Sequence, residues 1–292
     1  STLSLPGTAT NRINARPTIG AATGGTAERL SNTIISATDV IDTDGTIGRV
    51  EFFRDRNANG VFDATDQSLG NGSRQTGTNT WNLTTSTSGW ATGANPLSAR
   101  AVDNNNGNSV ISTATVTVVN ARPNIPTLSI NPAVIATIGD NITLTAGNVA
   151  DRDGSVESVR FYFDSNANGT YDAGTDTFLG QDFLPAGGWT FTFATTGYPV
   201  ATNRFFAITV DNESTLSLPG TATNRINARP TAGAVTASPN PVVRNNTVSI
   251  SVADIVDTDG TISRVEFWLD VNNDGLIQTS VDRSLGNGSR VG

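Results

Sequence analysis

The feature that most constrains this chain is an internal repeat. Residues 1–18, STLSLPGTATNRINARPT, recur letter for letter as residues 214–231, an identity that chance does not produce. A weaker copy of the same junction, VVNARPN, occupies residues 118–124. Alignment on the Asn-Ala-Arg-Pro element predicts repeats at 15–120 and 121–227, an incomplete repeat at 228–292, and the last strand of a preceding repeat at 1–14. We therefore expect a segment of a longer tandem array.

The composition removes most catalytic chemistry. The chain contains 21 Asp, 5 Glu and 18 Arg, and it has no Lys, His, Cys or Met. Imidazole bases, Schiff-base amines, thiol nucleophiles and disulfides are therefore excluded. A glycosidase needs only two carboxylates, but the acidic residues recur in every repeat, where an active site is not expected. The sequence predicts that the protein is not an enzyme.

Charge and hydropathy exclude two kinds of partner. The net charge is −8, and the arginines are scattered rather than clustered, which argues against binding to nucleic acid. No apolar run approaches the length of about 18 residues that a membrane-spanning helix needs. We expect no membrane span in this segment.

Alternating side chains predict strands. In the second repeat Val159, Phe161 and Phe163 alternate with Arg160 and Tyr162, the period of a half-buried strand. The corresponding inward residues are Val50 and Phe52 in the first repeat, and Val265, Phe267 and Leu269 in the third. Six or seven such strands per repeat, separated by Gly, Asn and Asp turns, predict an all-β fold built from antiparallel β-sandwiches.

The order of the sequence motifs adds a family resemblance. The motifs of the first repeat are Asp42–Gly45, Ile47–Phe53, Trp81, Ala99–Gly107 and Thr113–Pro123. This order resembles the bacterial immunoglobulin-like domains of large secreted and surface proteins, over both full repeats and part of the third. The resemblance implies a tandem array of immunoglobulin-like domains, an extracellular or cell-surface location, and a stalk or adhesion role.

Each repeat also carries a polar insert directly after the strand that contains Phe52, Phe161 or Phe267. The three inserts begin at Asp55, Asp164 and Asp270. Counting from that aspartate, an oxygen-bearing side chain stands at positions 1, 3, 5 and 9, glycine at position 6 and an apolar residue at position 8. This is the spacing of an EF-hand calcium loop, here between two predicted strands instead of two helices.

The predicted ligand for these loops is Ca²⁺. The apolar residue at position 8 (Phe62, Tyr171 or Ile277) is expected to anchor the loop on its domain. Position 12 lacks the usual bidentate Glu, and Asp66 replaces it in the first repeat, whereas Asp176 and Asp282 come one residue later. Fewer charges imply a dissociation constant of roughly 10⁻⁴–10⁻³ M. The predicted ligands are Asp55, Asn57, Asn59, Val61, Asp63 and Asp66; Asp164, Asn166, Asn168, Thr170, Asp172 and Asp176; and Asp270, Asn272, Asp274, Leu276 and Asp282. The alternative is a solvated turn without metal.

Two further features stay open. The Asp-x-Asp-Gly turns at 42–45, 151–154 and 257–260 are either tight turns or a second ion site, assisted by Asp103 or Asp211 and by Asn120 or Asn227. Trp90 and Tyr198 are expected at loop tips, where they could stack on a sugar.

The main hypothesis is an extracellular structural protein, a calcium-stiffened array that forms a surface fibre, a surface layer or an adhesin stalk. Its partners would be the neighbouring repeats and other copies of the chain, with donor-strand exchange through residues 1–14 as one route. The alternatives are a glycan-binding or surface-binding adhesion module, and spacer domains attached to a secreted enzyme.

Overall fold

The computed structural model describes residues 7–184 and 186–290, which contain strands and turns. No helix in these residues is long and apolar enough to cross a membrane. The chain divides into two compact units, one made of residues up to 124 with 149–157 and 209–217, the other of 125–148, 158–208 and 218 onward. The predicted all-β fold is confirmed.

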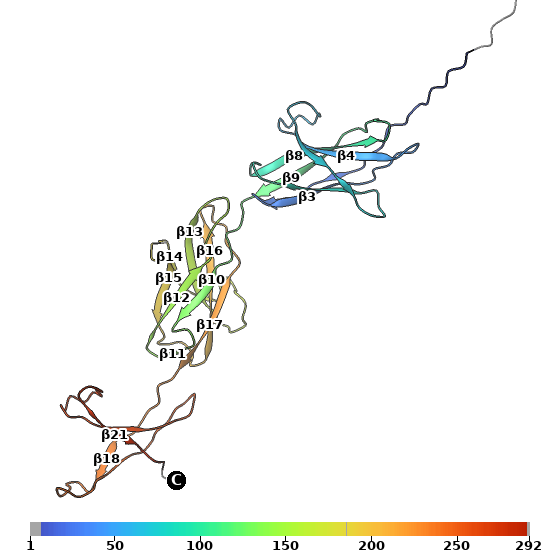
Figure 1. The fold of residues 1–292 in the computed structure, drawn as a ribbon. Coiled ribbons are helices and arrows are strands. Elements are labelled where there is room, and N and C mark those ends of the chain that lie inside the picture. The colour runs from blue at the N-terminus through green and yellow to red at the C-terminus, as the bar shows by residue number, and fades with distance from the viewer. Residues whose placement is uncertain (1–6, 185, 291–292) are drawn as a thin grey trace, which may run out of the picture. The chain divides into compact units, whose positions relative to one another are not determined.

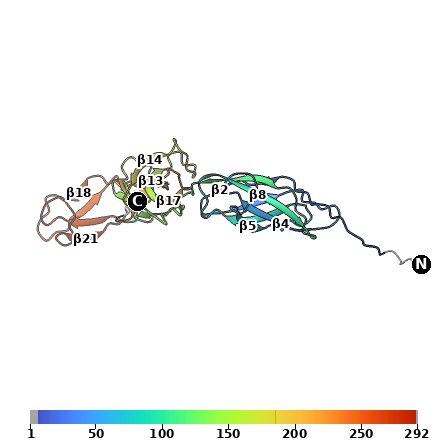
Figure 2. The same cartoon turned by 90° about the horizontal axis from the view of Figure 1, so that it is seen from above.

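The first repeat forms two sheets (Figure 1). Its strands are β1 (Ala22–Thr23), β2 (Thr26–Glu28), β3 (Asn32–Ala37), β4 (Ile47–Arg54), β5 (Gln67–Asn71), β6 (Ser73–Arg74), β7 (Trp81–Ser86), β8 (Gly93–Asp103) and β9 (Ser112–Val119). One sheet has the order β1-β3-β7-β6 and the other β2-β9-β8-β4-β5; β4, β5 and β8 of the second sheet are labelled in Figure 2. Strand β2 pairs in parallel with β9. This order is that of an immunoglobulin-like sandwich.

The second repeat has the same arrangement. Its strands are β10 (Thr127–Asn131), β11 (Ile135–Thr137), β12 (Asn141–Gly147), β13 (Val156–Phe163), β14 (Thr177–Asp182), β15 (Trp189–Ala194), β16 (Thr202–Asp211) and β17 (Gly220–Asn227). The sheets are β10-β12-β15 and β11-β17-β16-β13-β14. Strand β11 pairs in parallel with β17, as β2 does with β9, so the two complete repeats share one topology.

The third repeat has two hairpin-like pairs. Strands β18 (Val235–Ser238) and β19 (Ser249–Val252) pair, as do β20 (Glu266–Leu269) and β21 (Arg283–Asn287). The prediction that Leu269 faces a core is wrong, because this side chain is 49 % exposed. The described part of this repeat contains no strands after β21 that could cover it.

The core of the first repeat lies between its two sheets. Ile35 of β3, Phe52 of β4 and Val116 of β9 are buried together, and Val50 and Phe52 point inward as predicted. Trp81 packs against this cluster from the edge. The prediction that Trp90 lies at an accessible loop tip is wrong. Its side chain is 4 % exposed and belongs to the core, because the turn that carries it folds back over the sandwich.

Candidate metal centre

The three polar inserts occupy equivalent places in the fold. Residues 55–66 connect β4 to β5, residues 164–176 connect β13 to β14, and residues 270–282 connect β20 to β21. Each pair of strands is antiparallel, with a register shift directly after the phenylalanine that recurs in the three repeats: Phe52, Phe161 or Phe267. The inserts are therefore hairpin loops, as the strand-like flanks predict.

The aspartate at position 1 organises each loop through its own carboxylate. In the first repeat, Oδ1 of Asp55 accepts a hydrogen bond from the Asn59 N–H at 3.3 Å, and Oδ2 accepts one from the Gly60 N–H at 2.8 Å. Asp164 and Asp270 accept the equivalent bonds from Gly169 at 2.8 Å and Gly275 at 2.9 Å. The chain thus curls around the first carboxylate in all three repeats.

Glycine at position 6 is required by the backbone. Gly60, Gly169 and Gly275 have φ angles of 71°, 81° and 76°, in the left-handed region that a side chain disfavours. The residue at position 4 of each loop also has a left-handed backbone conformation, with φ of 55° at Ala58. Position 5 then accepts a hydrogen bond from the N–H of position 7, for example Asn59 Oδ1 from Val61 at 2.8 Å.

The carboxylate at position 9 is held by the loop amides. Oδ2 of Asp63 accepts from Nδ2 of Asn57 at 3.1 Å and of Asn59 at 2.9 Å. The hydrogen bonds from Thr65, followed by those from the two asparagines, hold the pKa of Asp63 well below its usual range. In the second repeat the bonds from Asn166 and Asn168 lower the pKa of Asp172. Both groups are therefore anionic at neutral pH.

The last acidic residues are equivalent despite the offset in their spacing. Oδ2 of Asp66 accepts from the N–H of position 9 at 3.2 Å, and Asp176 and Asp282 do so at 2.8 Å and 2.7 Å. The extra residue of the second and third loops lies between position 9 and this last aspartate. Oδ1 of Asp66 is buried without a hydrogen-bond partner, so this oxygen fits the role of a cation ligand.

The acidic side chains do not converge on one point. Across residues 7–184 and 186–290, no three Asp or Glu side chains are grouped so that they could hold a metal ion. Instead each loop is closed by hydrogen bonds between amides and carboxylates. The donor set, carboxylate and amide oxygens with a backbone carbonyl at position 7, is the one that calcium prefers. The residue types are thus those of a calcium loop, while the side-chain amides of Asn57 and Asn59 donate to Asp63 and hold the loop shape.

The apolar residue at position 8 anchors two of the three loops. The ring of Phe62 lies 4.1 Å from that of Phe53, between centroids, and the guanidinium of Arg100 lies 4.5 Å from the Phe62 ring. The ring of Tyr171 lies 4.9 Å from that of Tyr162. This confirms the predicted anchors in the two complete repeats. The prediction that Ile277 anchors the third loop is wrong, because this residue is 67 % exposed.

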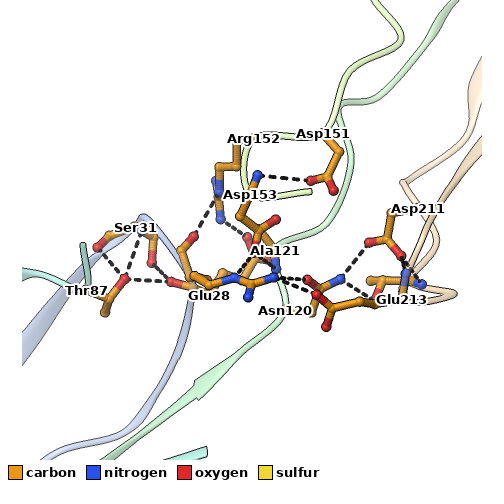
Figure 3. Close-up of polar contacts among 12 residues, drawn as sticks. Glu28, Ser31, Thr87, Asn120, Ala121, Asp151, Arg152, Asp153, Asp211 and Glu213 are labelled. Carbon is orange, nitrogen blue, oxygen red and sulfur yellow. Dashed lines mark hydrogen bonds and ion pairs between the residues drawn. The ribbon is translucent and has the colours of Figure 1, made fainter. Parts of the chain in front are cut away.

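A second group of polar contacts surrounds the Asp-x-Asp-Gly turn of the second repeat (Figure 3). Within the first compact unit, Asp153 Oδ2 accepts from Nε of Arg29 at 2.5 Å and from the Ala121 N–H at 3.0 Å. Nδ2 of Asn120 donates to Asp211 Oδ2 at 2.6 Å. The first repeat has the matching bond from Asn14 to Asp103, at 2.7 Å. The asparagine of the linker therefore binds the aspartate at the end of β8 or β16.

An arginine contacts the second aspartate of every such turn, and sequence reasoning missed this partner. Arg12 donates to the backbone carbonyl of Asp44 at 2.7 Å, and Arg225 donates to Asp259 Oδ2 at 3.0 Å. These two arginines occupy the same place in the duplicated segment, which is a signal the sequence carried. Arg29 has no such signal, because it follows β2 instead.

Tyr198, the other predicted sugar-stacking residue, is packed inside the second repeat. Its ring lies 5.1 Å from Phe163 and 5.0 Å from Phe193, between centroids, and burial raises its pKa. Together with the burial of Trp90, this leaves neither aromatic ring free to stack on a ligand.

Comparison with known proteins finds similar solved structures but no family model and no curated relative. A scan against protein-family models finds no match, and no curated protein matches the sequence. The fibronectin(III)-like modules of CbhA from Clostridium thermocellum are similar at 20 % identity and a TM-score of 0.29, over 73 % of this chain and 94 % of that chain. A chimeric titin Z1Z2 carrying a KLER peptide from decorin is similar at 17 % identity and a TM-score of 0.29, over 75 % and 99 %. Superoxide reductase (neelaredoxin) from Ignicoccus hospitalis is similar at 14 % identity and a TM-score of 0.24, over 36 % and 81 %.

The strand order of the two complete repeats thus defines a class of protein, a modular array of immunoglobulin-like β-sandwiches. The structural similarities, at these identities and TM-scores, carry no information on ligand or partner.

Proposed function

We propose that this chain is part of an extracellular structural protein, in which calcium bound by the hairpin loops stiffens a tandem array of β-sandwich domains. The array would serve as a surface fibre, a surface layer or an adhesin stalk. The observation that carries the proposal is the recurrence of one loop geometry at one place in three repeats. Each loop curls around the carboxylate at position 1 with a left-handed glycine at position 6.

Calcium binding is a means of stabilisation that the amino-acid composition of this chain still allows. Without Cys there are no disulfides, and the chain has no Lys for cross-links to Asn. The loops place carboxylates of like charge in one short hairpin, where a divalent cation offsets their repulsion. An ion that binds the folded loop and not the unfolded chain stabilises the fold by mass action, by about 2.7 kcal/mol at a hundredfold excess over its dissociation constant.

The test is a calorimetric melt of the whole chain in millimolar calcium, in millimolar magnesium and in excess chelator. We expect a shift to higher melting temperature that is specific for calcium, because calcium accepts six to eight oxygen ligands in variable geometry, whereas magnesium demands a near-ideal octahedron. A matched variant, Asp63→Asn with Asp172→Asn, keeps the shape of the side chains but removes two charges, and should reduce the shift. Identical melts in calcium and chelator would refute the calcium-stiffened array and leave the loops as ordinary turns.

The glycan-binding alternative receives no support from the aromatic residues proposed for it. Trp90 is buried and Tyr198 is packed among phenylalanine rings. We therefore propose no sugar site.

A further inference from the structure

The Asp-x-Asp-Gly turn of the second repeat contains two carboxylate oxygens that have no partner. Oδ1 of Asp151 accepts a hydrogen bond from the Asp153 N–H at 3.5 Å. Oδ2 of Asp151 and Oδ1 of Asp153 are both buried, and neither has a hydrogen-bond partner. The side chain of Asp153 is only 1 % exposed. A buried carboxylate oxygen without a donor is costly, and structures rarely leave one unsatisfied.

The two carboxylates face each other. Both belong to one short turn, which is drawn in Figure 3. The guanidinium of Arg29 binds the other oxygen of Asp153 and the carboxylate of Glu213. It therefore satisfies neither Oδ2 of Asp151 nor Oδ1 of Asp153.

A neutral oxygen donor lies beside the same pair. A Cβ atom placed on Gly154 would meet Asn212 Oδ1 at 2.4 Å and Asp151 Oδ2 at 2.7 Å. The absence of a side chain on Gly154 thus allows both oxygens to approach the turn. Asn212 Oδ1 accepts one hydrogen bond, from the Ser155 N–H at 2.8 Å, and retains a second lone pair.

The first repeat has the same arrangement around its first aspartate, whereas both oxygens of Asp44 accept from the Ala15 N–H. Oδ2 of Asp42 is buried without a partner. A Cβ on Gly45 would meet Asn104 Oδ1 at 2.5 Å and this Asp42 oxygen at 2.6 Å, and Asn104 Oδ1 accepts from the Thr46 N–H at 3.0 Å. Two sequences that differ around the turn, DTDGT and DRDGS, therefore leave the same oxygen unsatisfied in the same place.

We propose that the Asp-x-Asp-Gly turn of each complete repeat is a second divalent-cation site, separate from the hairpin loop, with calcium as its ligand. In the second repeat the direct ligands are Oδ2 of Asp151, Oδ1 of Asp153 and Oδ1 of Asn212, with water completing the shell. In the first repeat they are Asp42, Asp44 and Asn104. Two carboxylates and an amide are a small anionic set, so the binding is weak, as in other extracellular calcium modules.

The experiment counts calcium ions on the whole chain by isothermal titration. In a background that disables the hairpin loops, charged loop residues are replaced by their amides: Asp63→Asn, Asp66→Asn, Asp172→Asn, Asp176→Asn, Asp274→Asn and Asp282→Asn. We expect this variant to retain two calcium ions, one for each complete repeat. Adding Asp42→Asn and Asp151→Asn should abolish the remaining binding. If the loop sites fail, the native chain and the loop-disabled variant bind the same number of calcium ions. If the turn site fails, the loop-disabled variant binds none.

Melting of the single variant Asp151→Asn in the otherwise native chain gives a second readout. The new amide can donate to Asp153 Oδ1, so in chelator the variant should melt at or above the native temperature. In calcium it should lose part of the native shift. Two outcomes would overturn the proposal: a folded loop-disabled variant that binds no calcium, or an Asp151→Asn variant that retains the full shift. The second outcome would mean that a shared proton alone satisfies the pair.

Discussion

Nε of Arg29 lies 2.5 Å from Oδ2 of Asp153, a residue 124 positions later in the chain. The same guanidinium reaches Oε1 of Glu213 at 2.6 Å and Oδ1 of Asn120 at 3.0 Å. These hydrogen bonds raise the pKa of Arg29, those to Asp153 and Glu213 contributing most. One side chain of the first repeat thus gathers three segments that are remote in sequence.

Replacing Arg29 with Gln should destabilise the protein, because Asp153 would keep its buried charge and lose its partner. Chemical denaturation should show a lower midpoint. Arg264→Gln is the matched control, since Arg264 pairs with Glu266 on an exposed surface, where ion pairs contribute little. Equal effects of the two substitutions would mean that the Arg29 contact adds no more than a surface pair.

Glu51 should make stability depend on pH in the acid range. Burial raises the pKa of Glu51, but the hydrogen bonds from Arg100 and Arg49 outweigh this effect and lower it overall. A carboxylate with a lowered pKa in the folded state stabilises the fold above its unfolded pKa of about 4.3, and this contribution is lost as the pH falls through the folded value. Glu51→Gln should therefore lose less stability than the native chain between pH 7 and pH 3, by about 1 kcal/mol. Denaturation curves at both pH values give the unfolding free energies. An equal loss of unfolding free energy in the two proteins would contradict this prediction.

Phe62→Ala should loosen the first hairpin loop. The ring packs against Phe53 and under Arg100, so its loss should cost about 1–2 kcal/mol of unfolding free energy and weaken calcium binding at that loop. Ile277→Ala is the control, because Ile277 is largely exposed and should change neither quantity. Thermal melts with calcium titration of both variants check the prediction.

Gln278→Asp should strengthen calcium binding by the third loop. Gln278 stands at position 9, where the other two loops have aspartate, and its Nε2 donates to Asp274 Oδ2 at 2.6 Å. The substitution replaces a donor with a carboxylate and raises the anionic count, which tunes calcium affinity. A titration should show a severalfold lower dissociation constant for one site, and the variant should be less stable than the native chain in chelator.

Gly154→Ala should destabilise the turn of the second repeat. The added Cβ would meet Asn212 Oδ1 and Asp151 Oδ2 well inside contact distance, a type of overpacking that costs about 1–3 kcal/mol. Gly25→Ala is the control, since a Cβ there meets nothing within 4 Å. If both variants melt at the native temperature, the turn is looser than its geometry indicates.

Local patterns predicted the strands and the loop anchors because both depend on residues that are close in sequence. The alternation around Val159 and Phe161 fixes which face is buried, and the apolar residue at position 8 follows the loop spacing. The spacing also placed Asp66, Asp176 and Asp282 near the loops, but the sequence could not show that a one-residue offset leaves their contacts equivalent.

Contacts made across the fold were not predictable in this way. Trp90 follows a Ser-Gly turn, a context typical of exposed loops, and only the path of the chain buries it. Asp153 belongs to an Asp-x-Asp-Gly motif, but no motif marks Arg29, and only the tertiary structure brings the two together. The unpartnered oxygens of Asp42 and Asp151 likewise depend on side-chain positions that composition does not determine.

The hydrogen bond from Gly60 N–H to Asp55 also bears on the chemical ageing of this protein. Asparagine followed by glycine deamidates when the glycine nitrogen attacks the asparagine side chain and closes a five-membered imide. In the first two loops that nitrogen belongs to Gly60 or Gly169, and in each it donates at 2.8 Å to the aspartate at position 1. The bond that shapes the loop therefore also restrains the atom that would start the deamidation.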